Sequence, residues 1–190
     1  MTEIILASAS PRRRELLDQI GIRYDVKVAD VDESSVAGES ADEMVVRLAA
    51  LKAETIWQAS DKTRPVLGSD TLGELQGQLL VKPVDFAHAH EMLSAMSGAW
   101  HRILSAVAVR NEHGMNTALS ESKVWFRHLS DEEIKQYWNS GEPQDKAGSY
   151  AIQGLGAVFV ERIEGSYSGI MGLPLFETGQ LLRKVSVSVT

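Results

Sequence analysis

The stretch IILASASPRRRELL, residues 4–17, sets how the fold of this chain begins. An apolar run ends in small hydroxyl residues, Ser10 stands at the N-cap position, and Pro11 takes the first helical position, where a missing N–H costs nothing. The pattern predicts a strand, a tight turn and a helix start. Three arginines, 12–14, follow at the helix N-terminus, whose dipole and exposed N–H groups attract anions. The stretch therefore predicts a phosphate site, with a merely solvated basic turn as the alternative.

The amino-acid composition excludes several classes of function. The 190 residues, 44% of them hydrophobic, fit one domain or two small lobes with a real core. The lack of cysteine excludes disulfides, thiolate metal sites and a cysteine nucleophile. We find neither a run of 18 apolar residues nor a basic-apolar leader, so we expect no membrane association and a cytoplasmic location. The net charge of -7 argues against broad nucleic-acid binding, and any phosphate ligand must meet a local basic pocket.

Helical and strand patterns alternate along the rest of the chain, which predicts an α/β fold. Two capping boxes, Ser40 to Glu43 and Ser130 to Glu133, mark helix starts. The predicted elements are strands at 22–28, 66–71, 100–110, 116–128 and 157–162, a hairpin turn at 75–79, and helices at 41–60, after 85, at 131–139 and at 174–184.

Two acidic positions are candidates for chemistry. The loop 29–34 concentrates three carboxylates, among them Glu33, which can hold Mg²⁺ or Mn²⁺ or can simply keep the loop soluble. Asp70 ends a short buried strand, and the carboxyl ends of such strands form the usual ligand crevice of an open α/β sheet. Of all the acids in the chain, Asp70 is the one we expect to be catalytic.

Basic side chains and one long loop complete the candidate site. Lys52 lies on the helix 41–60, and Lys82 is a lone charge at the end of an apolar strand, where snorkelling is the alternative reading. Arg47 fits an ordinary surface charge. The Gly-rich loop 141–154 is long for a connector, which is typical of binding loops. Together these residues indicate metal-assisted phosphoryl or phosphodiester chemistry, and the residues alone lead no further than a phosphate-handling α/β enzyme.

The sequence also resembles a known family, the Maf-like nucleoside triphosphate pyrophosphatases. The matching segments follow one another in the family's order across nearly the whole chain. They are LASASPRRRELL at 6–17, VDE at 31–33, ESADEMVVRLAALKA at 39–53, VLGSDT at 66–71, VKP at 81–83 and EPQDKAGSYAIQG at 142–154.

The resemblance implies an elongated mixed β-sheet flanked by helices, with two lobes around a central cleft and a single domain over residues 1–190. It implies Asp70 as the proton acceptor and a divalent metal, Mg²⁺ or Mn²⁺, as cofactor. Glu33 and Asp70 are the expected ligands, and which of them is the main metal ligand stays open. A homodimer is an open alternative to a monomer. The substrate-binding residues would be Ser8, Arg12, Arg13, Lys52, Thr71, Lys82 and Gln153.

Within the family the chain is most similar to the branch acting on dTTP and UTP, marked by Arg12, Thr71 and Gln153. Two other functions remain open: a 7-methyl-GTP pyrophosphatase of the sister branch, and a non-catalytic nucleotide-binding regulator of septum formation. Two residues depart from the family's pattern. Gly73 stands where an aliphatic residue is usual, and Ser105 replaces a common threonine. Neither touches the expected catalytic set, so the departures bear on strand packing.

Overall fold

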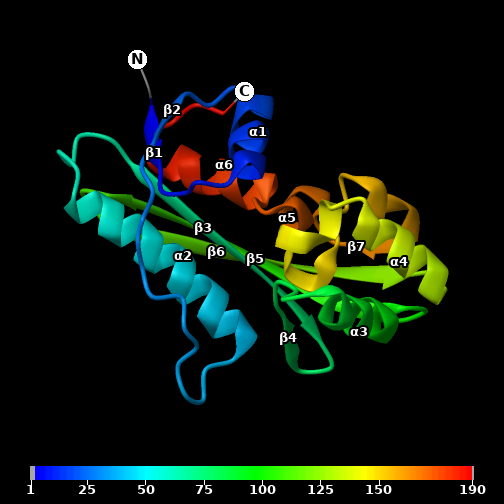
Figure 1. Ribbon diagram of the computed structural model, residues 1–190. Helices are drawn as coiled ribbons and strands as arrows, with labels where there is room; N and C mark the ends of the chain where they lie inside the picture. Colours follow the sequence, from blue (N-terminus) through cyan, green and yellow to red (C-terminus); the bar gives the residue numbers. More distant parts are fainter. Residues whose placement is uncertain (1–2, 190) are drawn as a thin grey trace. The chain divides into compact units, whose positions relative to one another are not determined.

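The computed structural model describes residues 3–189 and contains one mixed sheet of seven strands (Figure 1). The strand order is β2-β1-β3-β5-β6-β7, and β4 pairs with β3. The strands are β1 Ile4–Leu6, β2 Tyr24–Val26, β3 Val66–Leu75, β4 Gln78–Leu80, β5 Trp100–Asn111, β6 Gly114–Phe126 and β7 Val160–Glu164. β1 runs parallel to β2 and β3, whereas β3–β4 and β6–β7 are antiparallel. The predicted α/β fold with a mixed sheet and flanking helices is confirmed.

The chain forms two compact units. Unit 1 contains the described residues through Thr71, Leu104–Ser120 and those from Ser168 onward, and unit 2 contains Leu72–Ile103 and Glu121–Tyr167. The helices of unit 1 are α1 Pro11–Gln19, α2 Ala41–Gln58 and α6 Leu175–Lys184, with α5 Tyr167–Met171 at its boundary. Unit 2 holds α3 Phe86–Met96, α4 Asp131–Asn139 and the short 3₁₀ helices η1 Glu142–Asp145, η2 Ala147–Ser149 and η3 Leu155–Phe159.

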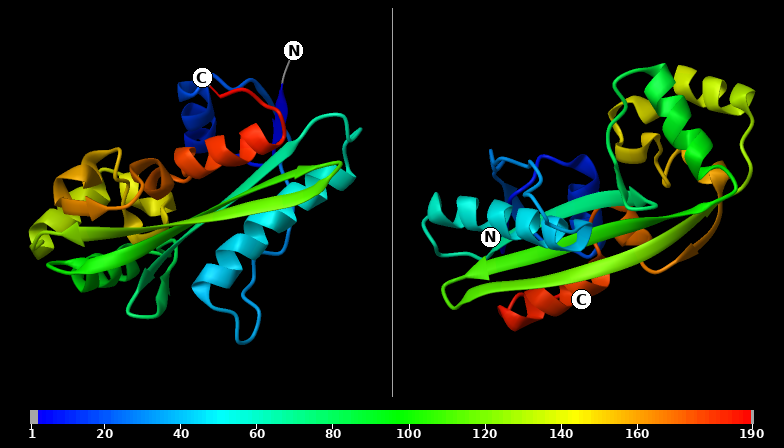
Figure 2. Two further views of the ribbon diagram at one scale, coloured as in Figure 1. Left: turned by 180° about the vertical axis from the view of Figure 1, so that it is seen from behind. Right: turned by 90° about the horizontal axis from the view of Figure 1, so that it is seen from below.

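In unit 1, α2 covers one face of the strands, and α1 and α6 cover the other (Figure 1, Figure 2). The core on the α1 and α6 side joins apolar residues of the first strand, the two helices and β5, among them Leu6, Leu17, Val107 and Leu182. On the opposite face, α2 approaches β3 at Gly68. A Cβ atom there would overlap the backbone oxygen of Ala49 and would lie 2.7 Å from the nitrogen of Ala53.

The core of unit 2 is aromatic. His101, Phe126 and Tyr150 meet edge to face, with ring centroids 4.8–5.4 Å apart. Phe159 packs on Phe126 and Tyr137 in the same manner. Aromatic pairs in this geometry stabilise a core beyond the area that they bury.

Both predicted capping boxes are confirmed: Ser40 and Glu43 bond reciprocally at the start of α2, as do Ser130 and Glu133 at the start of α4. Ser10 takes the N-cap position of α1, but its side chain makes no capping bond. The predicted strand at 157–162 is wrong in its first half, because residues 155–159 form η3 and the strand starts at Val160. Among residues 3–189, no helix is both long enough and apolar enough to span a membrane.

Candidate functional site

The candidate site is built in the middle of β3, where its fully buried first half ends. The strand predicted at 66–71 is longer than expected, because it continues to Leu75. Val66, Leu67 and the following residues are buried as the apolar run predicted, and the strand pairs in parallel with β1. Asp70 is the charged residue at the end of this buried run, and it is only 7% exposed. A buried carboxylate requires charged or hydrogen-bonding partners, because an isolated buried charge is strongly unfavourable.

Lys52 supplies that partner and joins the two predicted acidic positions. Its Nζ lies 2.6 Å from Asp70 Oδ1 and 2.6 Å from Glu33 Oε1. Lys52 and Asp70 are both buried, while the side chain of Glu33 is 60% exposed. One ammonium thus sits between two carboxylates, and this trio carries a net negative charge that favours a cation or further basic groups nearby.

Burial also sets the acidity of Asp70. It raises the pKa of this carboxyl above its ordinary value, and the positive charges of Lys52 and Arg13 oppose the shift only in part. A carboxylate with a raised pKa holds a proton more readily than an exposed one. This is the property required of a group that accepts a proton from water near neutral pH.

Arg13 links the turn after β1 to the turn before α6. Its Nε donates to the carbonyl of Gly172 at 2.9 Å, and its Nη1 donates to Ser8 Oγ at 3.1 Å. Ser8 Oγ also accepts from the backbone N–H of Ser10 at 3.2 Å. Burial lowers the pKa of Arg13, and the negative charge of Asp70 opposes that shift. Because a guanidinium has five donors, Arg13 keeps N–H groups for a ligand. Arg12 lies half-buried in the same helical turn.

The carbonyl of Gly172 gathers further donors from β3. Ser69 Oγ donates to it at 3.2 Å, and Thr71 Oγ1 lies at 3.4 Å. Gly172 has φ +128°, a conformation that disfavours side chains. Sequence reasoning missed this residue. The glycine directly before Leu173 and Pro174 is a signal that could have marked a chain reversal, but nothing in the spacing places it beside β3.

Thr71 lies in a chain of hydroxyl groups. Its Oγ1 is 2.9 Å from Ser105 Oγ, and Ser105 Oγ donates to the carbonyl of Gly169 at 2.6 Å. Ser105 is buried in β5, while Thr71 is half-buried. Ser105 was expected to affect strand packing alone, and its bond to Thr71 was not foreseen.

Arg47 is not a free surface charge as expected. Its Nε donates to Glu39 Oε1 at 2.5 Å, and its Nη2 donates to Glu39 Oε2 at 2.8 Å and to the carbonyl of Ser34 at 3.0 Å. Glu39 Oε2 also accepts from the N–H of Val36. Arg47 therefore fastens the acidic loop directly after Glu33.

Lys82 and Gln153 belong to unit 2. Lys82 is exposed two residues after β4, and its neighbour Val81 accepts a backbone bond from Gly148 at 3.0 Å. Gln153 is exposed in a turn closed by the bond from Gly154 N–H to the Ala151 carbonyl. The side chain of Gln153 thus faces solvent from an ordered turn.

Tyr137 and Glu142 hold that turn on both sides. Tyr137 donates to Glu142 Oε1 at 2.6 Å and accepts from the N–H of Ala151 at 3.1 Å. Glu142 also accepts from the N–H groups of Leu155 at 2.8 Å and Gly156 at 3.0 Å. Burial opposes the ionisation of Glu142, but these bonds outweigh it and the net pKa is lowered. A Cβ atom at Gly154 would overlap this carboxylate.

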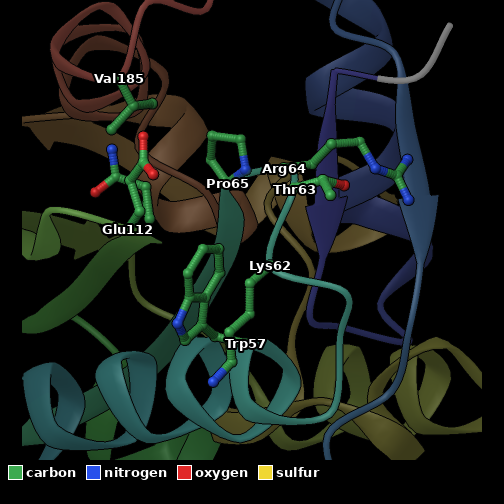
Figure 3. A pocket seen from close by; sticks show the side chains of 8 residues that line it. Trp57, Lys62, Thr63, Arg64, Pro65, Glu112 and Val185 are labelled. Carbon is green, nitrogen blue, oxygen red and sulfur yellow. The ribbon is translucent and has the colours of Figure 1, made fainter.

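A separate pocket of about 260 Å³ lies in unit 1 beside Pro65, directly before the amino end of β3 (Figure 3). Trp57, Lys62, Arg64 and Glu112 are among its lining residues. Its cations already have partners, since Lys62 Nζ donates to Gln58 at 2.9 Å and Arg64 pairs with Asp25 at 2.5 Å. None of the predicted site residues lines it.

The donor set of the candidate site fits a hard divalent cation. Within residues 3–189, no three His, Cys, Asp or Glu side chains are grouped so that they alone could hold a metal ion. Glu33 and Asp70 do converge on the same ammonium, and Mg²⁺ commonly uses one or two carboxylates together with substrate phosphates. The two carboxylates suit a metal that arrives with a phosphate ligand.

Comparisons with known proteins identify the family of the chain. The model of the family described as "Maf-like protein" matches residues 3–185. A dTTP/UTP pyrophosphatase of Cupriavidus pinatubonensis is 52% identical over 95% of this chain and 96% of its own length. One from Vibrio vulnificus is 48% identical over 97% and 99%. The solved structure of the Staphylococcus aureus Ham1 protein aligns with a TM-score of 0.43 at 18% identity, over 68% of this chain and 73% of that one, a likeness too weak to bear on the fold. On the match to the family model and the identity to these relatives, the chain belongs to the Maf-like protein family.

Proposed function

We propose that this protein is a nucleoside triphosphate pyrophosphatase that hydrolyses dTTP and UTP to the monophosphate and pyrophosphate. The observation that carries the proposal is the buried Lys52 ammonium held 2.6 Å from both Asp70 and Glu33, beside the Arg13 turn. The names of the relatives support the choice of substrate, because they are called dTTP/UTP pyrophosphatases and match nearly the whole chain. Strands β3, β5 and β6 each contribute residues to both units, which supports a single functional domain.

In the proposed reaction, Asp70 accepts the proton of the attacking water, for which its raised pKa suits it. Lys52 and Arg13 offset the negative charge that builds up as the bond between the α and β phosphates breaks and pyrophosphate leaves. The proposal assigns Lys82 the same duty toward the leaving group. Ser8 orients Arg13 through its 3.1 Å hydrogen bond.

Glu33 and Asp70 are the residues that would hold Mg²⁺ or Mn²⁺, with substrate phosphates supplying further oxygens. When bound, the ion supplies Lewis-acid stabilisation of the phosphate charge. Arg47 keeps the loop next to Glu33 in place through the Ser34 carbonyl. The exposed position of Glu33 leaves that carboxylate accessible to an incoming metal–nucleotide complex.

Base choice is assigned to Thr71, Gln153 and Arg12. A hydroxyl and an amide can pair with the O2, N3–H and O4 edge of thymine or uracil, and Arg12 can reach a carbonyl or a phosphate. A buried polar group that is left unpaired costs about 1–3 kcal/mol, so purines and cytosine should be poorer substrates. A cytoplasmic location belongs to the proposal, because nucleoside triphosphates are found there.

A pyrophosphate-release assay tests the proposal. Purified protein is supplied with dTTP, UTP, CTP, GTP or 7-methyl-GTP, each with Mg²⁺ or with Mn²⁺, and kcat/KM is measured. We expect dTTP and UTP to be cleaved at similar rates and ahead of the others. A preference for 7-methyl-GTP would place the chain in the sister branch. Nucleotide binding without turnover in either metal would favour the non-catalytic regulator.

A further inference from the structure

Thr71 and Ser105 form a chain of hydrogen bonds in which each hydroxyl has a defined donor direction. It ends at the carbonyl of Gly169, which can only accept. Ser105 Oγ donates its single proton to that carbonyl at 2.6 Å. Ser105 can then only accept from Thr71, whose Oγ1 lies 2.9 Å away. The proton of Thr71 is therefore directed into the protein.

The surroundings keep this direction fixed. Ser105 is 1% exposed and stands among the buried residues Leu104, Ala106 and Val107 of β5. Water does not compete there, and a hydroxyl in an apolar strand is unfavourable unless it is hydrogen-bonded. The second acceptor near Thr71 is the Gly172 carbonyl at 3.4 Å, and it too would draw the proton inward. Thr71 itself is half-buried, so its free lone pairs remain accessible.

We propose that Ser105 is a positioning residue for base choice: it fixes Thr71 as a hydrogen-bond acceptor that selects a base carrying N3–H. This inference rests on the proposed function. Uracil and thymine present an N3–H donor to such an acceptor, whereas N3 of cytosine is itself a lone-pair acceptor. Two acceptors facing each other leave both unpaired. The hydrogen-bond chain thus discriminates against CTP through N3 of the base, independently of any contact with the exocyclic group at C4.

The test compares kcat/KM for UTP and CTP in Ser105 variants. Ser105→Ala removes the inward acceptor and leaves only the longer 3.4 Å contact to Gly172, so Thr71 can turn and donate to N3 of cytosine. We expect the UTP/CTP ratio to fall about tenfold, mainly through faster CTP cleavage. Ser105→Thr keeps the hydroxyl and should restore the ratio. Ser120→Ala, at a buried serine of β6, is the matched control and should leave the ratio unchanged.

A double-mutant cycle identifies Thr71 as the intermediary. In a Thr71→Val background the Ser105→Ala change should no longer alter the ratio, because no hydroxyl remains to be turned. Tm is measured for every variant. If Ser105→Ala folds poorly, Ser105→Cys keeps the volume and weakens the acceptor, and it should also lower the ratio.

The outcomes separate the two proposals. An unchanged ratio in a folded Ser105→Ala protein, equal losses on both substrates, or additive effects with Thr71→Val would overturn the role of Ser105 while leaving the pyrophosphatase activity intact. A wild-type protein that cleaves neither UTP nor dTTP would overturn the proposed function and this inference with it.

Discussion

The two regions that carry the proposed base-reading residues differ in what is held in place: a side chain in one and the backbone in the other. In the middle of β3, the side chain of Thr71 is held through Ser105, and its hydroxyl has a fixed direction. In the 141–156 loop of unit 2, the backbone around Gln153 is held by Tyr137 and Glu142, while the Gln153 side chain is exposed.

This difference separates strict from adaptable recognition. A hydroxyl whose proton is committed distinguishes a donor from an acceptor on the base. An exposed amide carries a donor and an acceptor and can exchange them by a flip. We therefore expect Thr71 to set the strictness of base choice and Gln153 to adjust it.

The largest effect on activity should come from removing the acid next to Thr71. Asp70→Asn is nearly isosteric, and it removes the proton acceptor and a metal-binding charge. We expect kcat to fall at least about a hundredfold while the protein stays folded. Pyrophosphate release and Tm measure the two effects, with the exposed Asp30→Asn as control. Turnover within tenfold of wild type would contradict the assignment.

The units should also differ in acid stability because His101 is buried in unit 2. Burial lowers the pKa of His101 to about 4, from an ordinary value of 6.5. The unfolded chain then binds a proton that the folded unit refuses, so stability is lost as pH falls below 6.5 and the loss levels off near 4. Between pH 7.5 and 5 the free energy of unfolding should fall by about 2 kcal/mol.

Urea unfolding at both pH values measures this loss. His101→Phe should remove most of the pH dependence, whatever its effect on absolute stability. His113→Gln, at an exposed histidine, should leave it unchanged. Equal pH dependence in wild type and His101→Phe would show that another group is responsible.

Gln153 can be replaced by a residue that accepts hydrogen bonds but does not donate them. Gln153→Glu replaces an amide by a group that only accepts, which suits the N4 donor of cytosine and repels O4 of uracil. We expect the UTP/CTP ratio of kcat/KM to shift about tenfold toward CTP. Gln144→Glu, an exposed position in the same loop, is the control. A ratio that does not move would remove Gln153 from the base site.

The smallest effect should come from loosening the loop. Tyr137→Phe removes the hydroxyl that accepts from Ala151 and donates to Glu142. Amide exchange at Ala151 should become faster, and the UTP/CTP ratio should change about two- to threefold. Tyr167→Phe, which changes a half-exposed tyrosine, serves as the matched control. Unchanged exchange would show that the turn is ordered without this hydroxyl.

The sequence predicted those parts of the site that depend on local pattern. The Ser40 and Ser130 capping boxes predicted helix starts, which the structure confirms. The apolar run before Asp70 predicted the buried start of β3, but the strand end expected at residue 71 is wrong, because β3 continues to Leu75. The sequence placed Lys52, Glu33 and Asp70 in one candidate site, but it did not predict that Lys52 contacts both carboxylates.

Contacts between distant segments could not be predicted. Gly169 lies in α5 about 65 residues beyond Ser105, and Gly172 directly follows that helix about 100 residues beyond Thr71. No local pattern encodes contacts over such distances. The strand predicted at 157–162 failed for a related reason. Its apolar residues fit a strand, but the bonds of Glu142 to Leu155 and Gly156 hold this segment as a 3₁₀ turn.

The close approach of α2 to β3 at Gly68 has a consequence for protein engineering. Any side chain at position 68 would push against the backbone of Ala49 and Ala53, and so would move the helix that carries Lys52. The 2.6 Å contact of Lys52 with Asp70 would then be disturbed, although residue 68 has no functional side chain of its own. In a library of variants selected for activity, loss of substitutions at position 68 would therefore reflect the required spacing between α2 and β3. A design that transfers this site to another protein must keep that spacing as well as the charged residues.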